Sequence, residues 1–356
     1  MKNKYSVLLF LLLFLNFYSQ KKTFKCEKVY DAVKLIDAEK YNEAIAILRE
    51  CEKIDSKEYT YPYEIALAHT YNKEYEKAIT ELKRIKNYDN IGADYYQLLG
   101  NNFDYMGKPE QAILIYDEGL KKFPNAGRLY LEKGVMYEAE KPLDAIKIYE
   151  EGIEAEPMYP SNYYRASKIY LKTNDRLSGL IYGEIFMNLE RTTKRTQEMS
   201  ELLYNGYKNS MTFSKNEKRT DFCPSVIDID KFKTDKMMPL CSNFAFSFML
   251  AMTEFDEFNY INLMQMRKIF LKEYLNINKK VKNSPNVLIN YLKKMDDNKV
   301  FNAYNHYLFQ IANGDDFTKW QEKNKEEYDK FINWFTTTEN ELKIDSKNVY
   351  ISDQIK

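Results

Sequence analysis

The sequence is poor in the residues that carry most catalytic and metal chemistry. Its 356 residues include only two histidines, two tryptophans and eleven glycines. It contains no Gly-x-Ser-x-Gly, no glycine-rich phosphate or dinucleotide loop and no His-Glu-x-x-His, the patterns that activate a nucleophile, bind phosphate through backbone amides or hold zinc. We therefore expect no catalytic residue, no cofactor and a protein that is not an enzyme.

The few candidate reactive groups stand alone. His69 and His306 have no cysteine or second histidine nearby, so no zinc or other metal site is predicted. The acidic pairs at 296–297 and 315–316 are adjacent in sequence, whereas glycosidase carboxylates must face each other across a bond. An enzyme in the C-terminal region remains an alternative that would need His306 or an acidic pair to line a pocket.

The chain also lacks an excess of either charge. Lys+Arg and Asp+Glu both number 53, and no basic stripe is interleaved with stacking aromatics, so nucleic acid is not an expected partner. Hydrophobic residues make up 44% and charged residues 30%, a balance typical of folded, globular chains. The length exceeds that of one ordinary compact core, which predicts two structural units or a repeat array.

The longest apolar run is confined to the N-terminus. Lys2 and Lys4 precede nine apolar residues at 7–15, a run shorter than the roughly 20 residues that cross a bilayer. This pattern predicts a secretory signal peptide over 1–20, cut near Ser19 or Gln20, with an uncleaved anchor as the alternative. After its removal no spanning segment is expected, so the protein is predicted to be exported, to the periplasm or the cell exterior.

All four cysteines follow the predicted signal peptide. An even number of cysteines in an oxidising compartment favours disulfides. Four cysteines allow three pairings, and proximity along the chain favours Cys26–Cys51 and Cys223–Cys241. Free buried thiols are the alternative.

A small residue recurs with a period of 33 or 34 residues, at Ala44, Ala78, Ala112, Ala145 and Gly179. This period predicts an array of helix-turn-helix units in which each hairpin needs a neighbour to bury its other face. Prolines at 124 and 157 are expected to end second helices, because proline cannot continue the hydrogen-bond ladder.

The array resembles the tetratricopeptide repeat family. The fullest match covers 93–126, with the family's aromatic, small and proline positions at Tyr96, Leu99, Gly100, Phe103, Ala112, Tyr116, Gly119 and Pro124. The unit that follows matches at Tyr130, Gly134, Tyr137, Ala145, Tyr149, Gly152 and Pro157. Over 25–192 the resemblance implies an all-α fold, an α-solenoid of about five helical hairpins.

In this family the first helices line a concave groove that commonly holds a peptide or another protein. The resemblance implies groove positions at Asp94, Gln97, Asn101, Asp104, Tyr105, Arg128, Leu131, Glu138, Tyr164 and Lys168. The Lys and Asn set with which some members clamp a peptide's C-terminal carboxylate is absent. These residues can equally be a solvated wall of the groove.

Beyond the repeats, helical spacing continues without the period. Residues 193–242 are predicted to be a capping helix, over 195–212, and a linker with a short strand at 226–230. Residues 243–356 are predicted to be a helical C-terminal domain of no recognised family, with a buried helix in 243–277 and further helices over 285–296, 298–312 and 316–336. The aromatic stripe of the last helix is interpreted as core.

These features predict an exported scaffold or adaptor that binds a protein or peptide in the groove. The alternative from another class is a module that binds an extracellular glycan or small ligand through surface tyrosines, of which the chain has 31. Rows of exposed aromatic side chains would favour that alternative.

Overall fold

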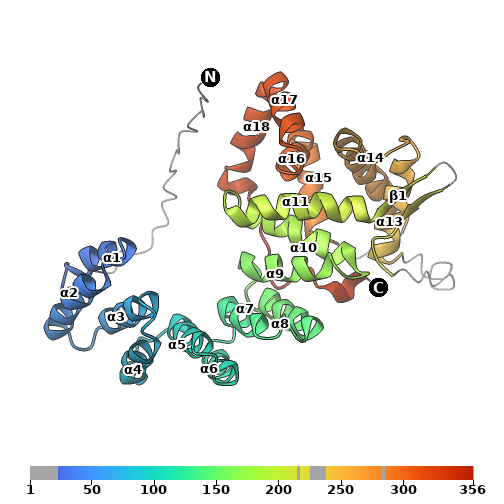
Figure 1. The fold of residues 1–356 in the computed structure, drawn as a ribbon. Helices are drawn as coiled ribbons and strands as arrows, with labels where there is room; N and C mark the ends of the chain where they lie inside the picture. Colours follow the sequence, from blue (N-terminus) through green and yellow to red (C-terminus); the bar gives the residue numbers. More distant parts are fainter. Residues whose placement is uncertain (1–22, 215–216, 225–237, 282–284, 356) are drawn as a thin grey trace, which may run out of the picture. The chain divides into compact units, whose positions relative to one another are not determined.

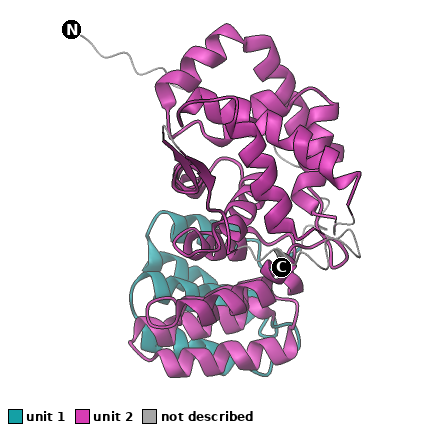
Figure 2. Cartoon of the chain, turned by 90° about the vertical axis from the view of Figure 1, so that its right-hand side faces the viewer, with its two compact units in different colours: residues 1–91 teal, residues 92–356 magenta. Residues whose placement is uncertain are grey.

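The structure is a computed structural model that describes residues 23–214, 217–224, 238–281 and 285–355. It is all-α apart from one short β-hairpin (Figure 1). The signal peptide predicted over 1–20 and the strand predicted at 226–230 lie outside the described residues. Two compact units divide the chain, residues 1–91 and 92–356 (Figure 2).

The first unit holds two helical hairpins. They are formed by α1 (Val29–Asp37), α2 (Tyr41–Ile54), α3 (Thr60–Tyr71) and α4 (Tyr75–Arg84). The second unit continues with three hairpins and a following helix, formed by α5 (Ala93–Tyr105), α6 (Pro109–Lys122), α7 (Gly127–Val135), α8 (Pro142–Ala155), α9 (Pro160–Tyr170), α10 (Arg176–Leu189) and α11 (Lys194–Asn209).

The rest of the second unit is a β-hairpin and a group of C-terminal helices. Its elements are β1 (Met211–Phe213), β2 (Lys218–Thr220), α13 (Leu240–Met252), α14 (Tyr260–Asn278), α15 (Val287–Asp297), α16 (Phe301–Leu308), α17 (Gly314–Lys323), α18 (Lys325–Phe335) and the 3-10 turns η1 (Thr338–Asn340) and η2 (Ser352–Ile355). The strands are antiparallel, with Met211 opposite Thr220.

Local sequence sets where several helices begin. Proline occupies the first turn of α6, α8 and α9, where its missing N–H has no helical partner to lose. Asp175 caps α10 by accepting a hydrogen bond from the Ser178 N–H, and Thr193 forms a capping box with Thr196 at the start of α11. The expected capping helix over 195–212 corresponds to α11.

Within a hairpin, two helices approach closely where the sequence has glycine. A Cβ atom on Gly100 would lie 2.1 Å from the Tyr116 ring, and one on Gly134 would lie 2.3 Å from the Tyr149 ring. Both tyrosines are fully buried. The small residue on one helix and the aromatic residue on the other therefore fit together, as the repeat pattern predicts.

The first unit is held together by a disulfide and by charged side chains. The disulfide Cys26–Cys51 joins the chain just before α1 to α2. On α2 and α4, two arginines and two glutamates alternate in ion pairs, among them Arg49–Glu52 at 3.0 Å and Arg84–Glu81 at 2.8 Å. Arg49 also pairs with Glu81 and Arg84 with Glu52, which links the two hairpins.

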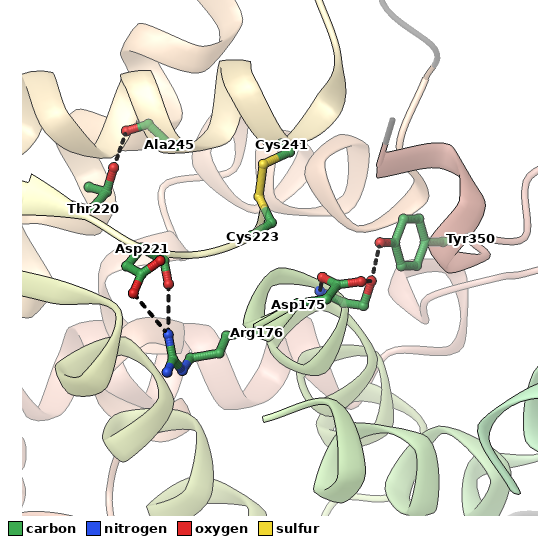
Figure 3. Close-up of a disulfide and its surroundings, with 9 residues drawn as sticks. Asp175, Arg176, Thr220, Asp221, Cys223, Cys241, Ala245 and Tyr350 are labelled. Carbon is green, nitrogen blue, oxygen red and sulfur yellow. Dashed lines mark hydrogen bonds and ion pairs between the residues drawn. A yellow bond between two sulfur atoms is a disulfide. The ribbon is translucent and has the colours of Figure 1, made fainter. Parts of the chain in front are cut away.

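The second disulfide, Cys223–Cys241, ties the segment after β2 to the start of α13 (Figure 3). That segment is anchored on the fifth hairpin, because the Leu177 N–H donates to the carbonyl of Phe222 at 2.8 Å. Arg176 also donates to the Asp221 carbonyl at 3.0 Å. Both disulfides match the pairing that proximity favours.

The C-terminal helices share one hydrophobic core with the fourth and fifth hairpins, running from Ala145 to Tyr350. The predicted boundary between 242 and 243 lies within this core, between Cys241 and Phe244. Inside this core, Arg267 of α14 and Glu184 of α10 form an ion pair at 2.6 Å, with side chains 1% and 2% exposed. The Arg267 guanidinium also donates to Asn305 at 2.7 Å and to Tyr207.

Two expected helices are each broken in two. The stretch 243–277 is not one buried helix but parts of α13 and α14, because the Asn259 side chain accepts a hydrogen bond from the Asn262 N–H and starts a new helix. The helix expected over 316–336 is α17 and α18. Asn324 leaves the helical conformation between them, with its side-chain amide donating to the carbonyl of Trp320.

Candidate functional site

The first helices of the third to fifth hairpins form the inner surface of the array. α5 packs on α7 and α7 packs on α9, whereas among the described residues no second helix packs comparably on the second helix of the next hairpin. The surface that carries the first helices is therefore the concave one. α11 follows and packs on α10 as α7 does on α6 and α9 on α8, so it is counted here as the first helix of an incomplete sixth hairpin. We call the surface of α5, α7, α9 and α11 that faces this side the first-helix groove.

Glu132 of α7 is the first of three charged groove residues and is contacted by side chains of α5. Gln97 of α5 donates a hydrogen bond to the Glu132 carboxylate at 2.7 Å. Burial raises the pKa of Glu132, and hydrogen bonds from Gln97 and Asn101 offset only part of this effect. Asn101 also accepts a hydrogen bond from the Tyr116 hydroxyl at 2.7 Å. The ring that fills the hairpin thus also orients a groove side chain.

Arg165 of α9 is the next charged group. It donates to Glu138, just beyond α7, at 3.1 Å, and the other oxygen of that carboxylate accepts from the Tyr149 hydroxyl at 2.6 Å. Arg165 also acts electrostatically on Glu132 and on Glu198 of α11. The guanidinium therefore lies among the acidic side chains of both neighbouring first helices.

Glu198 of α11 is the third charged residue, and with Glu132 and Arg165 it forms a row along the groove. Its carboxylate accepts from the Lys168 ammonium at 2.7 Å and from the Tyr164 hydroxyl. These hydrogen bonds, with Lys168 the larger contributor, lower the pKa of Glu198. Burial alone would lower the pKa of Lys168, but the hydrogen bonds with Glu198 and Tyr164 outweigh it and raise that pKa. The Lys168 ammonium also lies 5.0 Å from the centre of the Tyr164 ring.

The predicted groove residues fall in several places. Gln97 and Asn101 surround Glu132, whereas Asp94 and Arg128 line a separate cavity of about 550 Å³ at the other end of α5 and α7. Glu138 and Lys168 share a second cavity, of about 460 Å³. Asp104 is half-buried and Tyr105 is 54% exposed, both near the end of α5. Leu131 packs against the core, and Tyr164 is 6% exposed, so little beyond its hydroxyl faces the groove.

Sequence reasoning missed three residues that organise the groove. Glu132, Arg165 and Glu198 follow one another at intervals of 33 residues, one in each of three successive first helices. The 34-residue spacing counted from Gln97 points to Leu131 instead of Glu132. A search for charged residues recurring at 33 residues would have found all three.

No protein-family model matches the sequence, and no curated protein matches it. Several solved structures resemble about half of the chain. YrrB, described as a TPR protein with an unusual peptide-binding site, has a TM-score of 0.34 and 17% identity over 47% of this chain and 87% of YrrB. TTC0263, a thermophilic TPR protein of Thermus thermophilus, has a TM-score of 0.41 and 15% identity over 49% of this chain and 96% of TTC0263. PilW, a type IV pilus biogenesis factor, has a TM-score of 0.41 and 16% identity over 51% of this chain and 83% of PilW.

The packing of this chain itself decides the type of repeat. Helix pairs recur at the predicted period, and the glycine–tyrosine contacts at Gly100 and Gly134 occupy corresponding positions of successive hairpins. The array is a tetratricopeptide-type solenoid. The C-terminal helices pack on the end of this solenoid and cover the apolar face of its last hairpin, as the end of such an array requires.

Beyond the solenoid, the candidate reactive groups of the C-terminal helices have structural contacts. His306 is 4% exposed, stacks on Trp320 with ring centres 3.8 Å apart and has its Nδ1 atom 3.0 Å from the Tyr260 hydroxyl. Burial lowers the pKa of His306 to about 4. Among the described residues, no cluster of three histidine, cysteine or acidic side chains could hold a metal ion.

The described helices were also compared with the needs of a membrane span. None of them combines the length and the apolar composition required to cross a bilayer.

Proposed function

We propose that this protein is an exported scaffold that holds a protein or peptide segment in the first-helix groove. The groove's polar side chains carry the proposal. Glu132, Arg165 and Glu198 come from three successive first helices and lie along one concave surface. An extended segment laid across these helices would meet hydrogen-bonding groups at each of them.

The contacts within the groove leave capacity for a ligand. Arg165 has five N–H donors, of which Glu138 takes one among the described contacts. Tyr105 is half-exposed at the edge of the groove and offers an aromatic surface, a residue type enriched at protein interfaces.

Export is supported by two independent features of the chain. The positively charged start followed by a short apolar run is typical of a secretory signal. Both cysteine pairs are joined as disulfides, which persist in oxidising compartments. Fractionation of the native cells, with detection of the N-terminus of the mature chain, tests this part of the proposal: an intact signal in the cytoplasm would contradict it.

The glycan alternative has less support. It requires rows of exposed aromatic side chains, whereas Phe331 and Phe335 of the C-terminal aromatic stripe are buried and Trp320 is packed on His306.

The experiment is capture of crosslinked partners by the tagged mature protein in its native cells, under non-reducing conditions. A groove variant carries Asn101→Ala, Tyr105→Ala and Arg128→Glu. A control variant carries Leu114→Asp and Lys147→Glu on α6 and α8, the second helices. We expect one reproducible partner that is lost from the groove variant and kept by the control variant. Equal capture by both variants, or no partner at all, would contradict the proposal.

A further inference from the structure

One cavity of the groove is lined by three cationic side chains. It has a volume of about 460 Å³ and lies between the end of α7, the start of α8 and the second half of α9. Its lining includes Glu138, Arg165, Lys168, Ile169, Lys172 and Thr173. Arg165 and Lys168 are three residues apart on one face of α9, and Lys172 lies in the turn that follows the end of this helix at Tyr170. We call this cavity the α9 pocket.

The carboxylates nearby do not balance the three cations. Glu138 is engaged by Tyr149 and Arg165, and Glu198 is engaged by Lys168 and Tyr164. Lys172 is exposed, and its ammonium makes no hydrogen bond or ion pair with any described residue. The three cations therefore outnumber by one the two carboxylates that bind them, of which only Glu138 lines the pocket.

The geometry of Arg165 also suits an anion. Its contact with Glu138 uses one donor of a planar, five-donor group, and such a group can hold a carboxylate through two parallel hydrogen bonds. The Arg165 side chain is 37% exposed and that of Lys168 is 30% exposed, so both reach solvent and are partly shielded from it. The half-buried Ile169 adds an apolar surface for the carbon atoms next to a carboxylate.

We infer that the α9 pocket binds an Asp or Glu side chain of the segment that occupies the groove. This inference rests on the proposed function and names the chemistry of the partner. Arg165 belongs both to the pocket and to the row of groove residues, which places the acidic side chain next to the main chain of the bound segment. The partner is then a protein with an acidic residue inside its docking segment, because a side chain can enter the pocket while the chain continues along the groove.

The test uses the full mature protein and pools of fluorescent ten-residue peptides with blocked ends. Each pool has random positions and one central residue fixed as Asp, Glu, Asn or Gln. Blocked ends remove any terminal carboxylate, and the amides keep the shape of the acids without their charge. We expect the Asp and Glu pools to bind on the order of tenfold more tightly than the Asn and Gln pools. The preference should weaken as salt is added.

A variant locates the preference. Lys172→Glu reverses an exposed charge of the pocket and should abolish the preference for acidic peptides. Lys147→Glu, on α8, changes the net charge equally at a side chain that is 74% exposed and lies outside the pocket lining, and it should keep that preference.

The outcomes separate the inference from the proposed function. Equal binding of acidic and amide pools would overturn the inference and leave groove binding intact. Loss of the preference in both charge-reversal variants would also overturn it, because the cause would then be net charge and not the pocket. If no pool binds at any charge, both the inference and peptide binding in the groove fail together.

Discussion

The two hairpins of residues 1–91 and the last hairpin with its C-terminal helices are stabilised in different ways. The first two hairpins share a small core, in which the disulfide Cys26–Cys51 closes the first hairpin. A partly exposed square of charges formed by Arg49, Glu52, Glu81 and Arg84 links the two hairpins. The fifth hairpin is covered by helices α13 to α16, and one of its links to them is the fully buried pair Arg267–Glu184. The hairpins with less apolar cover are linked by ion pairs at the surface, whereas the covered hairpin has its ion pair in the core.

The largest effect should come from breaking the buried pair. Arg267→Met leaves the Glu184 carboxylate buried without a charged partner, which is expected to cost about 3–5 kcal/mol of unfolding free energy. Denaturant unfolding of the purified protein measures this cost. The double variant Arg267→Met with Glu184→Leu should recover most of it, because no charge is then left buried.

A control for this prediction is Lys293→Met, which breaks an exposed pair with Asp297 and should change the free energy of unfolding by less than about 1 kcal/mol. If Arg267→Met and Lys293→Met cost the same, the second unit would not depend on its buried pair.

The first disulfide should rank next. Replacing Cys26 and Cys51 together by serine opens a loop with a sequence separation of 25 residues, which is expected to cost about 3 kcal/mol in the chain-entropy model. Hydrogen exchange should speed up in α1 and α2 and stay unchanged in α14 to α16. If the exchange rates of α1–α2 and of α14–α16 rose by the same factor, the disulfide would not stabilise the first unit in particular.

His306 makes the C-terminal helices sensitive to acid. Its pKa is about 4 in the folded chain and 6.5 in the reference state, so the unfolded chain binds more protons between these values. The stability that comes from keeping His306 neutral is therefore fully present above about pH 6.5 and is lost as the pH falls towards 4. Between pH 7 and 5 this group should cost about 2 kcal/mol.

His306→Gln cannot take up the proton but can still form a hydrogen bond with Tyr260. Its free energy of unfolding, measured across the same pH range, should lack that part of the acid loss. Parallel pH profiles for the two proteins would rule out His306 as the source.

The smallest effect is expected in the charge square. Arg49→Gln removes ion pairs whose arginine is 38% exposed, so solvent screening limits the cost to about 1 kcal/mol or less. The difference from wild type in denaturant unfolding should shrink further in 1 M salt. A cost that is larger, and insensitive to salt, would mean that the square acts through packing and not through charge.

The sequence predicts the hairpins because their packing imposes a local rule. A glycine at 100 or 134 and an aromatic residue 15 or 16 positions later must meet, so the period is visible without a structure. A 34-residue count from Gln97 selects Leu131, and a slip of one residue on a helix turns a side chain by about 100°, so Glu132 was missed.

Other features have no local signal. Glu184 and Arg267 are 83 residues apart in the sequence and meet only because the C-terminal helices fold back on the fifth hairpin. The breaks at Asn259 and Asn324 involve single side chains that cap or end a helix. Helical spacing alone therefore predicts helices there and not their ends.

The most direct test of the groove is photo-crosslinking at single positions in the native cells. A benzophenone side chain is placed at Tyr105, which is 54% exposed on α5, or at Leu114, which is 67% exposed on α6. We expect a discrete crosslinked partner from position 105 and none from position 114. A partner crosslinked from position 114 and not from 105 would contradict the proposal that the first-helix groove is the binding surface.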